Sequence, residues 1–303
     1  MEIRLLRAFV AVADASSFTD AAAELSITQP ALTKQVQALE SSIGTQLFRR
    51  GRHGAELSAA GLALLAEART LVDLADRFAE RARRLARGEE GSLTVGFGLS
   101  SITVAPRAVA ALRRRTPGVD VRLEDMASSA QVSAVRDGSL DIAFARLPVP
   151  RDLRSVPVLA DRLAIAFPLT WTTPPNEGAA LALWFSEKVL IRLRSARGPG
   201  LAAHVARFLV DAAVRPAGVQ EADDLQTVLA LVAAGAGAAI VPESALHIAP
   251  ARVGVISVPG ENAAWTVGAV WRSDDASPIV RTFLEELARL RAPIGAPGPA
   301  DPA

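Results

Sequence analysis

The segment Ser26 to Gly44, SITQPALTKQVQALESSIG, constrains the fold of this chain more than any other. Thr28 can cap a helix, Pro30 fits a first turn in which a missing N–H costs nothing, and Gly44 suits the residue that ends a helix. The outer face of a helix that only covers a core more often carries Glu and Lys. This one carries glutamines and a threonine with one lysine, so the sequence predicts a capped helix with an exposed face made for contact.

Two more helices are expected before this segment. Apolar residues recur at helical spacing from Leu5 to Ala13. Either Ser17 or Thr19 can cap a second helix over residues 20–25, and a tight turn then leads into the third. Two short helices joined by such a turn form a helix-turn-helix. The residues expected to pack its helices together are Ala22, Leu25, Ile27, Leu32 and Val36.

The outer face of the third helix has the chemistry of a DNA-reading surface. Glutamine can form hydrogen bonds with adenine N6 and N7, and lysine can donate to guanine O6 and N7, in the major groove. We therefore predict that this helix reads base edges. The residues that share this face are Gln29, Thr33, Lys34 and Gln37.

A basic, glycine-containing loop follows, in TQLFRRGRHGAEL at residues 45–57, and it predicts a short β-wing. Residues 1–57 carry six bases and six acids, but residues 28–55 carry four bases against Glu40 alone. Only one edge of this domain is therefore basic. We assign Arg50 and Arg52 to phosphate or minor-groove contacts, the alternative being a solvated charged turn.

A long helix is expected next, over residues 58–87, with Ser58 as its cap. Small and apolar residues recur in it at alternating spacings of four and three, the pattern of a coiled-coil seam. The helix either packs on its own domain or pairs with its twin, and the strict period favours the pairing. The predicted dimerisation seam comprises Leu64, Ala68, Leu71, Ala75 and Phe78.

After the break GEEG the pattern changes to alternating strands and helices, which predicts an α/β domain with a parallel sheet. We expect two lobes. One comprises residues 91–160 plus 267–291, and the other comprises residues 161–266. The tail over residues 292–303 is rich in Pro, Ala and Gly and is expected to be disordered.

Two helix N-termini in this part are candidates for binding a small anion. GFGLSSIT places Ser100, Ser101 and Thr103 at one of them, and RSARGPGLAAHV places Arg197 and Gly198 before the other. Ordinary helix capping is the alternative. Arg146 ends a strand at the edge where α/β sheets bind ligands, so it either faces the cleft or pairs with an acid.

Composition gives no support to catalysis, metal binding or a membrane location. The chain has no Cys and only three His, in separate segments, so neither a metal site nor a cofactor is expected. His204 is expected on a helix surface. We identify no signal peptide, and the most apolar run, at 228–241, is too short to span a bilayer, so we expect a cytoplasmic protein. The alternative is a periplasmic-type binding protein or enzyme whose first domain serves only oligomerisation.

The block LRAFVAVADASSFTDAAAELSITQPALTKQVQALESSIGTQLFRR resembles the DNA-binding domain of LysR-type transcriptional regulators. The resemblance continues through DGSLDIAFARLPV and AGAGAAIVP, and so covers nearly the whole chain. It implies a winged helix-turn-helix, a dimerising linker helix and a two-lobed effector domain like a periplasmic binding protein. It also implies a homodimer or homotetramer on an interrupted palindrome of double-stranded DNA, control of a neighbouring gene, a small-molecule effector and RNA polymerase as a partner.

The same resemblance assigns roles to individual residues. The family's recognition positions fall on Gln29, Pro30, Thr33 and Lys34, where relatives more often have Ser-Arg at the last two. Its effector contacts fall on Ser100, Ser101 and Ser128 in the first lobe and on residues 197–200 in the second. The effector we expect is a small carboxylate, aromatic or derived from an aromatic. FPLTWTTPP departs from the family's His-Pro-Leu-Ala-like segment in the second lobe.

Overall fold

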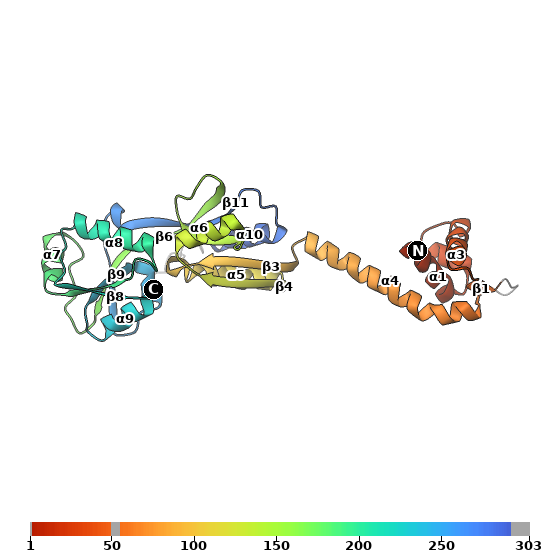
Figure 1. The fold of residues 1–303 in the computed structure, drawn as a ribbon, viewed down its shortest axis with the longest axis horizontal. Coiled ribbons are helices and arrows are strands. Elements are labelled where there is room, and N and C mark those ends of the chain that lie inside the picture. Colours follow the sequence, from red (N-terminus) through yellow and green to blue (C-terminus); the bar gives the residue numbers. More distant parts are fainter. Residues whose placement is uncertain (1, 50–54, 292–303) are drawn as a thin grey trace, which may run out of the picture. The chain divides into compact units, whose positions relative to one another are not determined.

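The computed structural model describes residues 2–49 and 55–291. Contacts along the chain divide it into two compact units, Met1–Ala86 and Arg87–Ala303 (Figure 1). No helix in the described ranges is both long and apolar enough to cross a membrane.

The first unit is helical with one small hairpin. Its elements are α1 (Ile3–Ala15), α2 (Phe18–Glu24), α3 (Gln29–Ile43), β1 (Phe48–Arg49), β2 (Glu56–Leu57) and α4 (Ala59–Ala86). Ser17, rather than Thr19, caps α2, because its side chain accepts the N–H of Asp20. Gly44 ends α3 in the left-handed conformation, with φ +73°. The helix-turn-helix and its wing hairpin therefore form where the sequence predicts them.

The core of the first unit is closed by aromatic and small residues. Phe48 of the hairpin contacts the rings of Phe9 and Phe18 edge-on, at centroid distances of 5.6 and 5.5 Å. Gly61 of α4 lies so close to β1 that an added Cβ would stand 2.2 Å from the Leu47 carbonyl oxygen. Arg7 of α1 donates two hydrogen bonds to the Asp76 carboxylate of α4, at 2.6 and 3.0 Å. These contacts fix α4 on its own domain from Gly61 to Asp76.

The second unit is an α/β domain built on one sheet. Its strands are β3 (Glu90–Phe97), β4 (Gly118–Asp125), β5 (Ile142–Arg146), β6 (Leu153–Pro168), β7 (Val189–Leu193), β8 (Gly218–Ala222), β9 (Ala238–Pro242), β10 (Val253–Ser257) and β11 (Ala264–Arg272). Its helices are α5 (Val104–Arg115), α6 (Ser128–Asp137), α7 (Gly178–Ser186), α8 (Pro199–Asp211), α9 (Leu225–Ala233) and α10 (Pro278–Arg291), with 3-10 turns η1 (Leu99–Ser101), η2 (Glu243–His247) and η3 (Glu261–Ala263).

The strands run in the order β4-β3-β5-β11-β6-β9-β7-β8, and β10 also pairs with β6. The pairs β3–β4, β3–β5, β7–β8 and β7–β9 are parallel, as expected from the βαβ order. All pairs that involve β6 or β11 are antiparallel. The prediction of an α/β fold is confirmed. The prediction of a parallel sheet holds only in part, because β6 and β11 run antiparallel to their neighbours and are not reached through a crossover helix.

Strand β6 belongs to both parts of the sheet. Its residues 153–162 pair with β11, and its residues 163–168 pair with β9 and β10. We call the part with β3, β4, β5 and β11 lobe 1, and the part with β7 to β10 lobe 2. The chain returns to lobe 1 through η3 and β11, so two connections join the lobes.

Candidate DNA-reading face and effector cleft

Helix α3 separates its residues cleanly by environment. Leu32, Val36 and Leu39 are buried in the core of the first unit. The predicted reading residues lie on the other side. Gln29, Pro30, Lys34 and Gln37 are exposed, and Thr33 is half-buried. The Thr33 hydroxyl donates to the Gln29 carbonyl at 2.9 Å, which leaves its oxygen free to accept.

The wing is tied to α3 by one carboxylate. Glu40 accepts the backbone N–H of Leu47 at 2.7 Å and that of Phe48 at 3.3 Å. Phe48 then pairs with Leu57 across the hairpin. Arg50 and Arg52, the predicted wing contacts, lie outside the described residues. The base of the wing is therefore fixed relative to the reading helix.

The predicted dimerisation seam of α4 divides into a covered and an exposed part. Ala68 is 4% exposed and packs in the core of its own domain, and Ala75 is half-buried. Leu64, Leu71 and Phe78 are 41%, 42% and 74% exposed, although each is large and apolar. Ala68 was thus placed on the seam by its spacing, whereas its side chain is covered by its own domain. The exposed stripe with a repeat of seven is Leu64, Leu71, Phe78 and Leu85.

In lobe 1 a short 3-10 turn precedes the helix whose N-terminus is a candidate anion site. Residues 99–101 form the separate turn η1, and α5 starts at Val104 after Thr103. Ser101 is buried, and its hydroxyl donates to the Gly98 carbonyl at 3.0 Å and accepts the Gly98 N–H at 3.3 Å. Ser100 and Ser101 therefore lie in a 3-10 turn before the helix, whereas Thr103 directly precedes its first residue. Ser100 is half-buried and Thr103 is exposed.

Other predicted effector residues come together between the lobes. The backbone N–H of Arg146, at the end of β5, donates to the Ser128 hydroxyl on the first turn of α6 at 3.3 Å. The Arg146 guanidinium donates to the Gly200 carbonyl in the first turn of α8 at 3.4 Å. Gly198 caps that helix, and Arg197 is exposed just before it. In addition, η1 packs against η2 of lobe 2.

The sheet register explains where the Arg146 side chain lies. Arg146 pairs with Val267 of β11, and Trp265, two residues along on the same face, pairs with Asp161 of β6. Arg146 and Trp265 are therefore diagonal neighbours. The guanidinium carbon lies 3.7 Å from the centroid of the Trp265 ring. Asp161 is buried and accepts from the Ser244 hydroxyl of η2 at 2.8 Å.

Arg146 is a half-buried cation without a matching anion. Among the residues that the structure describes, no carboxylate forms an ion pair with it within 4.0 Å. Burial lowers the pKa of Arg146 to about 10, and the charge of Asp161 opposes that shift. Of the two alternatives for Arg146, a place at the cleft is thus favoured over a pair with an acid. An unpaired, partly desolvated guanidinium attracts a small anion strongly.

Three residues of this cluster were not predicted. His204 of α8 is only 7% exposed, so its expected place on a helix surface was wrong. Its ring lies 5.1 Å from that of Trp265, and its Nε2 donates to the Asn262 carbonyl at 2.6 Å. Trp265 and Asp161 depend on pairing between distant strands, so no local pattern pointed to either residue.

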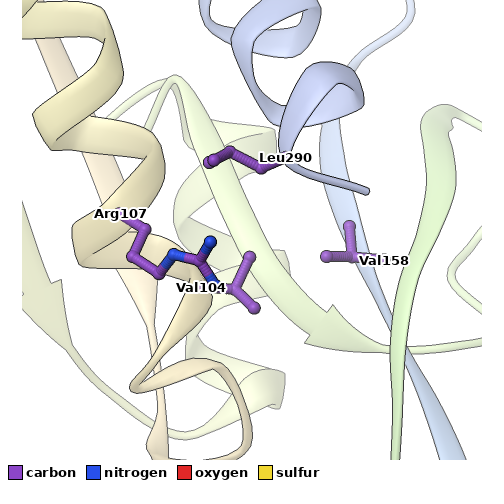
Figure 2. A pocket seen from close by; sticks show the side chains of 4 residues that line it. All are labelled: Val104, Arg107, Val158 and Leu290. Carbon is purple, nitrogen blue, oxygen red and sulfur yellow. The ribbon is translucent and has the colours of Figure 1, made fainter. Parts of the chain in front are cut away.

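A cavity of about 260 Å³ lies elsewhere, within lobe 1. Figure 2 shows its lining, Val104 and Arg107 from α5, Val158 from β6 and Leu290 from α10. None of these is a predicted effector residue. No cluster of three potential metal ligands occurs in the described part of the chain.

Comparison with known proteins identifies both units. Residues 3–62 match the family model for bacterial regulatory helix-turn-helix proteins of the lysR family, and residues 86–292 match the LysR substrate binding domain. Among named relatives, the regulator ClcR of Pseudomonas putida is 33% identical over 95% of this chain and 98% of its own length. The regulator IlvR of Caulobacter vibrioides is 35% identical over 94% and 96%.

Solved structures agree with the sequence relatives. CbnR, a LysR family transcriptional regulator, is 31% identical, covers 95% of this chain and 100% of its own, and has a TM-score of 0.75. Full-length CbnR in complex with its target DNA gives 30% identity, coverage of 95% and 99%, and a TM-score of 0.74. These relatives are regulators rather than enzymes. This chain belongs to the LysR family: it is a DNA-binding transcriptional regulator with a small-molecule effector domain.

Proposed function

We propose that α3 reads the operator by entering the major groove. The observation that supports this proposal is that α3 has a buried apolar side and an exposed side. The reading residues would be Gln29, Pro30, Thr33, Lys34 and Gln37. The wing, held to α3 through Glu40, would bring its arginines to the sugar-phosphate backbone. Because the target is chromosomal DNA, we place the protein in the cytoplasm.

A second element of the proposal is dimerisation through α4. The exposed stripe of Leu64, Leu71 and Phe78 has the repeat of a coiled-coil seam, and the same face of a second copy would cover it. Two paired helices would carry two DNA-binding domains, one for each half-site of an interrupted palindrome. The effector domains would join such dimers into a homotetramer.

The third element is a small carboxylate bound between the lobes at Arg146. The half-buried guanidinium has no anionic partner among the described residues, and it lies beside the first turn of α8. The backbone N–H of the same residue holds the Ser128 hydroxyl. Ser100, Thr103, Arg197 and Gly198 would complete the site at its edges. The buried hydroxyl of Ser101 would shape η1 rather than touch the ligand. Binding would change the angle between the lobes and so the way that the oligomer bends DNA.

The DNA proposal is tested by anisotropy titration with the region upstream of the protein's own gene. The Thr33→Ala, Lys34→Ala double variant should lose specific binding and keep the wild-type unfolding midpoint. Ser41→Ala, an exposed change on the same helix, is the matched control and should bind as the wild type does. Unchanged operator affinity of the double variant would refute the reading face.

The effector proposal is tested by a thermal-shift screen of small carboxylates, with benzoate as the aromatic member. A ligand that binds only the folded state stabilises it by about 2.7 kcal/mol at 100 times its dissociation constant. Arg146→Met should abolish the shift, whereas Arg107→Met, in the separate cavity of lobe 1, should keep it. A shift that survives Arg146→Met would place the ligand elsewhere.

A further inference from the structure

Arg146 is the one predicted effector residue whose side chain reaches from lobe 1 to lobe 2 within the described residues. It stands on β5, and its guanidinium donates to the Gly200 carbonyl of α8 at 3.4 Å. Such a contact between a cation and a backbone carbonyl is only as strong as the geometry that maintains it, because the arginine side chain is long and flexible.

The Trp265 ring supplies that geometry. The guanidinium carbon lies 3.7 Å from the ring centroid, within the range of a cation–π contact, so the ring covers one face of the guanidinium. A planar guanidinium stacked on a ring keeps its N–H groups at its edge, where they can still donate. Trp265 is 9% exposed and lies on β11, which pairs with both β5 and β6. It is therefore held on a rigid strand between the lobes.

Lobe 2 contacts the same ring from α8. His204 lies 5.1 Å from Trp265, centroid to centroid, and is itself fixed by its bond to the Asn262 carbonyl of η3. Gly200 and His204 are one helical turn apart on α8. The first two turns of α8 thus meet Trp265 through His204 and Arg146 through Gly200.

We propose that Trp265 is a positioning residue that holds Arg146 in a latch across the lobes, bonded to Gly200 when no anion is present. The latch comprises Arg146, Trp265 and the Gly200 carbonyl. It deepens the proposed function, since the guanidinium that would bind the effector is the one that joins the lobes. An anion that recruits Arg146 then competes directly with the Gly200 carbonyl.

Amide hydrogen exchange on the full-length, ligand-free protein tests the latch. In Arg146→Met and in Trp265→Leu, amides of residues 202–205 should exchange roughly tenfold faster, which corresponds to about 1.4 kcal/mol. The double variant should be no faster than either single one, because both changes remove the same contact. Trp265→Phe, which keeps a ring under the guanidinium, should recover most of the protection.

Trp271→Leu is the matched control, since it removes a tryptophan from the same strand at a position that lies opposite Arg154 of β6 in the backbone register. It should leave residues 202–205 unchanged, and exchange in β3 reports whether any variant is globally destabilised. Additive effects of Arg146→Met and Trp265→Leu, or no effect of Trp265→Leu in a protein with normal β3 protection, would overturn the latch. Benzoate in excess is a separate arm. If benzoate leaves the amide exchange of residues 202–205 unchanged in the wild type, the proposal of a carboxylate effector fails. The ligand-free variants still test the latch in that case.

Discussion

The carboxylate of Glu40, in the last turn of α3, accepts a hydrogen bond from the backbone N–H of Leu47 at 2.7 Å. Leu47 is buried, and its own carbonyl lies against the start of α4 at Gly61. One acidic side chain therefore connects the reading helix, the wing and the linker helix. Glu40 is the single acid in the otherwise basic segment 28–55, and its carboxylate stabilises the fold.

Removal of that carboxylate should loosen the wing. We expect Glu40→Ala to lower the free energy of unfolding of the first unit by about 1–3 kcal/mol, because two partly buried backbone donors lose their acceptor. Urea unfolding followed by circular dichroism measures it. Glu24→Ala, an exposed acid on α2, is the control. A loss no larger than that of the control would mean that water replaces the carboxylate.

Lys34 should set sequence preference at one base pair. It donates from a single ammonium, whereas arginine presents a planar fork that matches guanine O6 and N7. Lys34→Arg should therefore raise selectivity for guanine at one position by about 1–2 kcal/mol and leave the other positions unchanged. Selection from a randomised operator library measures this preference. A change spread over the whole site would show that residue 34 contacts phosphate instead.

The exposed stripe on α4 should control assembly. Phe78→Asp should separate the dimer, since it places a charge in the middle of an apolar seam. Light scattering gives the mass directly. Leu62→Asp is the control, because Leu62 is 65% exposed on the same helix but off the stripe. If both variants keep the wild-type mass, the subunits associate through other surfaces.

His204 should make the effector domain sensitive to mild acid. Burial lowers the pKa of His204, the charges of Arg146 and Arg207 lower it further, and the bond to Asn262 opposes them. The unfolded chain therefore binds a proton first as the pH falls below about 6.5, and the folded state loses stability from there down to the lower folded pKa. In His204→Gln the urea midpoint should change less over that window. His247→Gln, exposed on η2, is the control.

The elements that follow local rules were predictable from the sequence. Ser17, Pro30 and Gly44 act through helix ends, which depend on a few neighbouring residues. Strand β6 contains Pro157, a residue that usually argues against a strand. In the structure Pro157 lies at a register shift opposite Gly268, where the ladder is already irregular.

Two further elements escaped prediction for different reasons. Helix α7, GAALALWFS, is apolar nearly all round and so lacks an amphipathic period, and it follows TTPPNEG, which favours a loop. Strand β10 is five residues long and alternates weakly. Both depend on neighbours that only the folded chain brings together.

The candidate site was predictable only where it lies on a helix end or a strand end. Arg146 was found in this way, whereas Ser128 came from the family resemblance. Trp265 and Asp161 join them through the register of β5, β11 and β6. Strands β5 and β11 are more than a hundred residues apart in the sequence. Burial of His204 follows from that same pairing, which no local pattern encodes. The place of the DNA-reading side chains stays a prediction until an operator is titrated.

Strand β6 also limits how the two lobes can move. A β-strand is already close to the maximum length of its backbone, at about 3.3 Å per residue. Since β6 is continuous from Leu153 to Pro168, the lobes cannot separate along it without breaking hydrogen bonds on either side. They can still turn about its axis near Arg162, where the pairing changes from β11 to β9. The signal that leaves the cleft would then be a torque on the strand rather than a change in its length.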